Sequence, residues 1–273
     1  MLIQRIRRSF LHQLFLYSTM FYALCSEALA QQKLTIASGN FAPYFQEDDV
    51  TGDGYFDLIL LKVLNKEGYN NINLVSLNND AIKRYFINGV ADVAINYTAM
   101  PPSNSYTSKY RVKFLNRVIM HTDQWSNDIK KLHDLNGFTL ASFTGASNLF
   151  GNEFKKFTQS DSVKYFETAN QQALNKLLHK NKIDVRIGDY LMFYRHTAYV
   201  SGLNPNDYVS LDLLDYQGSF IVFHDKKLRD RFDHKLGQLI QSGEINTITQ
   251  EWLKFYNLPS AIEHTFFPSI ADR

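Results

Sequence analysis

The stretch Phe138 to Phe150, FTLASFTGASNLF, is typical of a short strand, a glycine-containing turn and the start of a helix. In such a turn the backbone N–H groups of Thr144 to Ser147 converge on the first helical turn, where unpaired donors and the helix dipole favour an anion. Thr144, Gly145 and Ser147 are therefore candidate ligand-binding residues. The same pattern is also a common connection in α/β proteins, so the turn alone does not define a site.

A carboxylate and an arginine occur close together in the run IDVRIGD, Ile183 to Asp189. Asp189 could accept a hydrogen bond from a cationic ligand group, or it could cap the helix that we expect to begin near Tyr190. Arg186 lies on the strand face opposite its two apolar neighbours. Pairing with a nearby carboxylate would offset the cost of burying its charge, although Arg186 is also a possible partner for an anion.

Aromatic and amide side chains follow the predicted strands of the first half of the chain. Phe41 and Tyr44 belong to the loop FAPYF after LTIAS, and Asn96, Tyr97 and Thr98 end or follow the strand ADVAI. Aromatic rings at such positions can stack on a ligand or wall it in, and they can equally plug the end of a core.

Signs of enzyme chemistry are few in this sequence. It contains no H-E-x-x-H, no G-x-S-x-G and no P-loop motif, and none of its histidines form a close pair placed for a metal. The acidic cluster of Glu47 to Asp49 with Asp53 lacks the alternating spacing of a calcium loop and indicates a solvated turn. We therefore expect no metal, no cofactor and no catalytic residue.

The first thirty residues have the layout of a secretory signal peptide. A basic start, MLIQRIRR, precedes an apolar run from Phe10 to Leu24 and the cleavage pattern Ala28-Leu29-Ala30. The apolar run is shorter than the roughly 20 residues of a membrane span, and two polar residues interrupt it. Cleavage after Ala30 removes Cys25, the only cysteine. We expect a periplasmic protein with a large core and no disulfide.

The net charge of the mature chain gives no argument for a strongly charged binding partner. Removing residues 1–30 takes away three arginines and one glutamate, which leaves 26 basic and 26 acidic residues. Such a balance provides no argument for nucleic acid or an anionic membrane surface.

The mature chain begins with alternating strands and helices. Strands are expected at Leu34 to Ser38, Ile72 to Leu77 and Ala91 to Ile95. One helix is expected from Tyr55 to Glu67, and a second, capped by Asn79 or Asp80, is expected to run through Asn88. This β-α-β-α-β order predicts a mostly parallel sheet covered on both faces.

The same order recurs in the second half. FTLAS at 138–142 echoes LTIAS at 34–38, and Ala173 to Ile187 aligns without a gap on Ala81 to Ile95. Two such matches in the same order predict two similarly built α/β lobes. Val112 to His121 and Gly218 to His224 would form two hinge crossings. We expect lobe 1 at 31–117, lobe 2 at 118–222, a return to lobe 1 at 223–258, and a loosely attached tail at 259–273.

Ligands of open α/β sheets bind at the carboxyl ends of the strands. The loops at those ends would enclose a small polar solute, because they combine aromatic, hydroxyl and carboxylate side chains. The candidate ligand-binding residues are Phe41, Tyr44, Asn96, Tyr97, Thr98, Thr144, Gly145, Ser147 and Asp189.

Residues 33 to 256 resemble bacterial extracellular solute-binding protein family 3, which serves polar amino acid ABC transporters. The resemblance rests on the order of several short features: the loop Phe41 to Tyr44, the run IKKLHDLNG before FTLAS, the turn Gly145 to Ser147, the IDVRIGD segment and the terminal SGEINTITQEWL.

The resemblance implies a monomeric periplasmic-binding-protein type II fold that closes on an amino acid and delivers it to the permease of an ABC importer or to a sensor kinase. Asp189 would bind the amine, while Ala146 stands where a threonine is usual. The arginine expected near Ser103 to Asn104 is missing, which makes an α-amino acid a doubtful ligand unless another arginine substitutes; the candidates are Arg111, Arg186 and Arg195.

Two other functions are compatible with these residues. One is a periplasmic enzyme on the same fold, such as a dehydratase of small cyclic acids, with Asp189 or Glu153 as general acid/base. The other is a signalling module that has lost amino acid binding.

Overall fold

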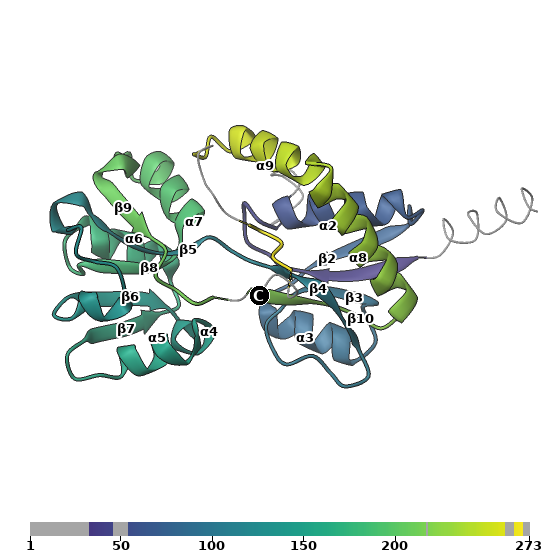
Figure 1. Cartoon of the computed structure of the whole chain (residues 1–273), viewed down its shortest axis with the longest axis horizontal. Helices are drawn as coiled ribbons and strands as arrows, with labels where there is room; N and C mark the ends of the chain where they lie inside the picture. The colour runs from purple at the N-terminus through teal and green to yellow at the C-terminus, as the bar shows by residue number, and fades with distance from the viewer. Residues whose placement is uncertain (1–32, 46–53, 217, 260–264, 270–273) are drawn as a thin grey trace, which may run out of the picture. The chain divides into compact units, whose positions relative to one another are not determined.

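The computed structural model describes residues 33–45, 54–216, 218–259 and 265–269. The expected signal peptide and the acidic turn at 47–53 lie outside these residues. Residue contacts divide the chain into two compact units, Met1–Ser108 with Phe220–Asn246 and Lys109–Ser219 with Thr247–Arg273. Each unit is built on a five-stranded sheet with helices against it (Figure 1). Within the described ranges, no helix is long and apolar enough to cross a membrane.

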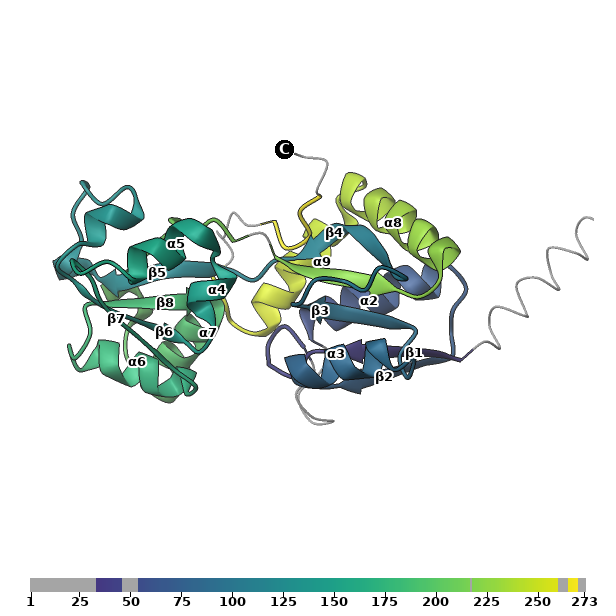
Figure 2. The same ribbon diagram turned by 90° about the horizontal axis from the view of Figure 1, so that it is seen from below.

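The first sheet has the strand order β2-β1-β3-β10-β4. Strands β1 to β3 are parallel, and β10 runs antiparallel to β3. Helices flank this sheet (Figure 2), which confirms the predicted α/β class. The elements are β1 (Leu34–Ser38), α2 (Tyr55–Lys66), β2 (Ile72–Ser76), α3 (Asn79–Ile87), β3 (Val93–Tyr97), β4 (Tyr106–Val112), β10 (Ser219–Phe223), α8 (Lys226–Gln241) and α9 (Glu244–Phe255).

Local sequence explains where these helices begin and end. The apolar stripe of α2 is buried as its spacing predicts, and Gly68 follows the helix in a left-handed conformation. Helix α3 begins one residue earlier than expected, because the Asn78 side chain accepts a hydrogen bond from the Ala81 N–H and acts as the cap. The predicted caps, Asn79 and Asp80, are instead the first residues of the helix.

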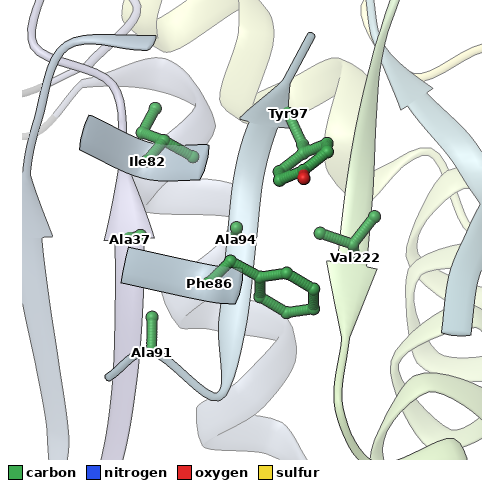
Figure 3. Packing of buried hydrophobic residues seen from close by; sticks show 7 residues of the cluster. All are labelled: Ala37, Ile82, Phe86, Ala91, Ala94, Tyr97 and Val222. Carbon is green, nitrogen blue, oxygen red and sulfur yellow. The ribbon is translucent and has the colours of Figure 1, made fainter. Parts of the chain in front are cut away.

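A buried cluster joins α3 to the centre of the first sheet (Figure 3). Small side chains on the strands leave room for Phe86, whose ring contacts Tyr97 edge to face at 5.8 Å. His224 stacks on Phe86 at 4.0 Å between ring centroids, and its Nε2 lies 2.9 Å from the Phe86 carbonyl oxygen. The cluster consists of Ala37, Ile82, Phe86, Ala91, Ala94, Tyr97 and Val222.

The second sheet repeats the plan of the first, with the order β7-β6-β8-β5-β9. Strand β6 lies between β7 and β8 and is parallel to both, as β1 lies between β2 and β3. This shared arrangement explains the similarity of LTIAS and FTLAS. The elements are β5 (Asn116–His121), β6 (Thr139–Phe143), α4 (Ala146–Leu149), α5 (Gly151–Thr158), β7 (Lys164–Thr168), α6 (Gln171–His179), β8 (Val185–Asp189), α7 (Tyr190–Arg195), η3 (His196–Val200) and β9 (Tyr208–Leu211), with single-turn helices η1 (Thr122–Gln124), η2 (Leu132–Leu135) and η4 (Pro205–Asp207).

The described part of the C-terminal tail is firmly attached, which corrects the expectation of a loose segment. Phe266 and Phe267 are buried. The backbone N–H groups of Arg111 and Lys113 donate to the carbonyl oxygens of Pro268 and Phe266, at 3.0 and 2.9 Å. The described residues of the tail are therefore held by backbone hydrogen bonds and by two buried aromatic side chains, without helical structure.

Candidate functional site

The glycine turn after β6 has the geometry that its sequence predicts. Gly145 has a φ of 91°, which a residue without a Cβ adopts most readily, and α4 begins directly after it. The N–H groups of Gly145 and Ser147 both point at a carboxylate, that of Glu167 on β7. The distances are 2.6 Å from Gly145 N to Oε2 and 2.8 Å from Ser147 N to Oε1. An internal anion therefore occupies these donors.

Glu167 is held in this position by further contacts. It is half-buried, it pairs with Ser142 in the ladder between β6 and β7, and the Tyr165 hydroxyl donates to its Oε1 at 2.9 Å. Burial raises the pKa of Glu167, but the hydrogen bonds from Ser147, Gly145 and Tyr165 outweigh it and lower the pKa. Among the described residues, no lysine, arginine or histidine nitrogen lies within 4.0 Å of this carboxylate. The turn therefore carries a negative charge that no ion pair neutralises.

Replacing Glu167 with glutamine should lower the free energy of unfolding by about 1–2 kcal/mol at pH 7, since charge-assisted hydrogen bonds are lost. A carboxyl whose pKa is lowered on folding stabilises the protein above its ordinary pKa, near 4.5, and loses that contribution as the pH falls through the folded value. The stability difference between wild type and E167Q should therefore shrink below pH 4.5. Urea unfolding at pH 7, 5 and 3.5 measures it, and a difference that does not change with pH would contradict the assignment.

Asp189 ends β8 and is 5% exposed. Its Oδ1 accepts from the Met192 N–H at 2.8 Å, so it caps α7, which begins at Tyr190 as expected. Strand β5 places Asn116 opposite Asp189 in the antiparallel ladder. The capping role that the sequence predicts as one alternative is therefore present.

Arg186 is buried at 1% exposure, and no carboxylate of the described residues lies within 4.0 Å of its guanidinium, although the charge of Asp189 acts on it. Its Nη1 donates to the carbonyl oxygen of Asp189 at 3.2 Å, and its guanidinium lies 5.6 Å from the centre of the Phe193 ring. Its Nε has no hydrogen-bond partner in the described part of the chain. The carboxylate of Asp184 instead accepts from the Thr139 N–H and the Gln124 side chain. Burial lowers the pKa of Arg186 to about 10, against the opposing effect of the Asp189 charge.

The environment of Arg186 also affects two histidines. Burial lowers the pKa of both His179 and His196, and nearby positive charge, including Arg186, lowers it further.

The other two arginine candidates lie on different elements. Arg111 is in β4, and Arg195 ends α7 with its guanidinium 5.8 Å from the Tyr256 ring.

In the first sheet, most of the expected aromatic residues are core residues. Tyr44 is fully buried and stacks on Phe56 at 5.4 Å, and Tyr97 belongs to the cluster of Figure 3. Phe41 is half-buried and meets Tyr44 edge to face at 6.2 Å. Thr98 is exposed after the end of β3.

Asn96 differs from its neighbours. It is 2% exposed, it has a φ of 64°, and its Nδ2 donates to the Asn79 Oδ1 at 3.0 Å. Its Oδ1 is buried, and none of the residues that the structure describes donates a hydrogen bond to it. A buried acceptor left unpaired is costly, so this oxygen at the carboxyl end of β3 is a candidate to receive a ligand N–H group.

Several polar groups at the carboxyl edges of the sheets were missed by the sequence analysis. Ser38 at the end of β1 donates to Asp57 in the first turn of α2, and both are buried. Asp57 thus supplies an acidic group beside β1, where the sequence shows none in Ser38 to Asn40. In the second unit, Tyr216 and Ser219 are buried, and burial raises the pKa of Tyr216.

A cavity of about 640 Å³ lies in the first unit, at the opposite ends of these strands. Its polar lining is largely satisfied from within the chain. Asp92 accepts from the Thr35 N–H, Asp225 caps α8 by accepting from the Leu228 N–H, and Arg231 donates to the Tyr69 hydroxyl. We therefore assign the candidate site to the carboxyl ends and not to this cavity.

No protein-family model matches the sequence, and no curated protein sequence matches it. Solved structures do match over most of the chain. The arginine 3rd transport system periplasmic binding protein from Legionella pneumophila is 14% identical, with 81% of this chain and 100% of that chain covered and a TM-score of 0.56. An ABC uptake transporter substrate-binding protein from Streptococcus pneumoniae with bound histidine is 19% identical, with 84% and 95% covered and a TM-score of 0.59.

The GluR0 ligand-binding core in complex with L-glutamate is 15% identical, with 82% of this chain and 99% of that chain covered and a TM-score of 0.62. At such identities the likeness establishes the fold. The chain has the two-lobed periplasmic-binding-protein fold, as the sequence predicts.

Proposed function

We propose that the chain is a periplasmic solute-binding protein that binds a small polar solute and delivers it to an ABC importer or a sensor. The observation that carries the proposal is the placement of buried polar groups at the carboxyl ends of parallel strands in both sheets. Asp57 and Asn96 lie there in the first sheet, and Asp189 lies there in the second. These are the strand ends at which open α/β sheets bind ligands.

The structural neighbours support the same function. They include the periplasmic binding protein of an arginine transport system, a transporter substrate-binding protein with bound histidine, and a ligand-binding core in complex with L-glutamate. The signal-peptide pattern with cleavage after Ala30 supports export. Two of the candidate residues, Tyr44 and Tyr97, would support the site from the core. The proposed binding residues are Phe41, Asp57, Asn96, Thr98, Thr144, Gly145, Ser147 and Asp189.

Chemical unfolding in the presence of amino acids, amines, organic acids and sugars tests this proposal. A solute that binds only the folded chain should raise the free energy of unfolding by about 2.7 kcal/mol at 100 times its Kd. A compound recovered in chemically altered form would indicate an enzyme instead. No effect from any class of compound would contradict the proposal.

A further inference from the structure

We propose that Glu167 is a specificity residue that excludes carboxylates from the glycine turn, so that the solute is an organic cation without a carboxylate at that position. This inference rests on the proposed function and names its substrate class. The two N–H groups best placed to bind a carboxylate, those of Gly145 and Ser147, already donate to Glu167 at 2.6 and 2.8 Å.

A solute carboxylate could reach these donors only by displacing Glu167, and the structure opposes that displacement. Glu167 belongs to a strand and not to a loop, with its Cα in register with that of Ser142 on β6. Its Oε1 also accepts from the Tyr165 hydroxyl at 2.9 Å. Displacement would break three hydrogen bonds and would bring a second negative charge toward the first.

The charge balance at this edge favours a cation. Glu167 has no ion-pair partner within 4.0 Å among the described residues. Lys155, on the neighbouring helix α5, donates to the Asn148 side chain instead. Arg186 lies beside Asp189 and offsets that carboxylate, whereas no cation of the described ranges does so for Glu167. The edge therefore keeps one excess negative charge.

Pairs of compounds that differ by one carboxylate provide the test, namely agmatine against L-arginine and histamine against L-histidine. Calorimetric titration of the wild-type protein should show binding of at least one pair. Within that pair, the amine should bind at least tenfold more tightly than the amino acid. In Glu167→Ala the freed N–H groups should accept a carboxylate, so this preference should fall at least tenfold. Glu167→Gln, which disturbs the fold least, should shift the preference in the same direction.

Asp161→Asn is the matched control, because Asp161 is exposed just before β7 and its loss changes the net charge equally. The control should keep the wild-type preference. Wild-type protein that binds an amino acid as tightly as its amine would overturn the inference and leave the proposed function standing. Tight binding of a neutral sugar, unaffected by E167Q, would overturn it as well. No binding of any compound would contradict the proposed function itself.

Discussion

Replacing Gly218 with alanine is expected to lower the free energy of unfolding by about 2–4 kcal/mol, through backbone strain and crowding. Gly218 has a φ of 83°, a conformation that L-residues rarely adopt. A Cβ built there would lie 2.6 Å from the Val112 carbonyl oxygen and 3.0 Å from the Arg111 Cβ. The segments around 112 and 218 can approach so closely only because this residue has no side chain.

Gly68→Ala separates the cost of backbone strain from the cost of crowding. Gly68 has a φ of 90°, and a Cβ there would have no atom within 4 Å. Its replacement should cost only about 1 kcal/mol, the cost of the left-handed conformation. Urea unfolding curves of both variants measure the difference. Equal losses at the two positions would show that crowding against Val112 is unimportant.

Replacing Asp189 with asparagine should weaken binding of a cationic solute by about 10- to 100-fold. An interaction with a charged group contributes about 1.5–3 kcal/mol, and each 1.4 kcal/mol is tenfold in affinity. The asparagine Oδ1 can still accept from the Met192 N–H, which Asp189 binds at 2.8 Å. Helix α7 should therefore remain capped, and the variant should melt within a few degrees of the wild type.

Asp225→Asn is the same substitution at a second helix cap. Asp225 accepts from the Leu228 N–H at 2.8 Å at the start of α8, with the same geometry as Asp189. Calorimetric titration should show an unchanged affinity in D225N. If D189N also keeps its affinity, Asp189 is a cap alone and plays no part in binding.

Much of the fold could be predicted from the sequence, because its strongest signals are periodic or repeated. The helix predicted at Tyr55 to Glu67 and the similarity of LTIAS to FTLAS both correspond to observed elements. Strands β7 and β9 were missed because both are edge strands, in which no residue is fully buried. Their sequences show no continuous apolar run, although such a run is the usual signal of a strand in a covered sheet.

The contacts of the candidate site could not be predicted from the sequence, because they depend on which residues of neighbouring strands lie opposite one another. The turn at Gly145 is visible in the sequence, but its acceptor, Glu167, lies some twenty residues away on the next strand. The contact becomes evident only when β6 and β7 are paired residue by residue. Likewise, Tyr44 and Tyr97 follow strands as ligand-contacting aromatics do, yet their burial shows that they fill the core.

Native mass spectrometry of the mature protein tests the central claim, solute binding, most directly. The protein should carry or take up one small polar molecule per chain, and the mass of that molecule after release should identify a compound with a basic nitrogen. D189N should lose most of this species under the same conditions. A protein that has the bare mass after native purification, and that gains no mass from amines, amino acids, organic acids or sugars, would contradict the account.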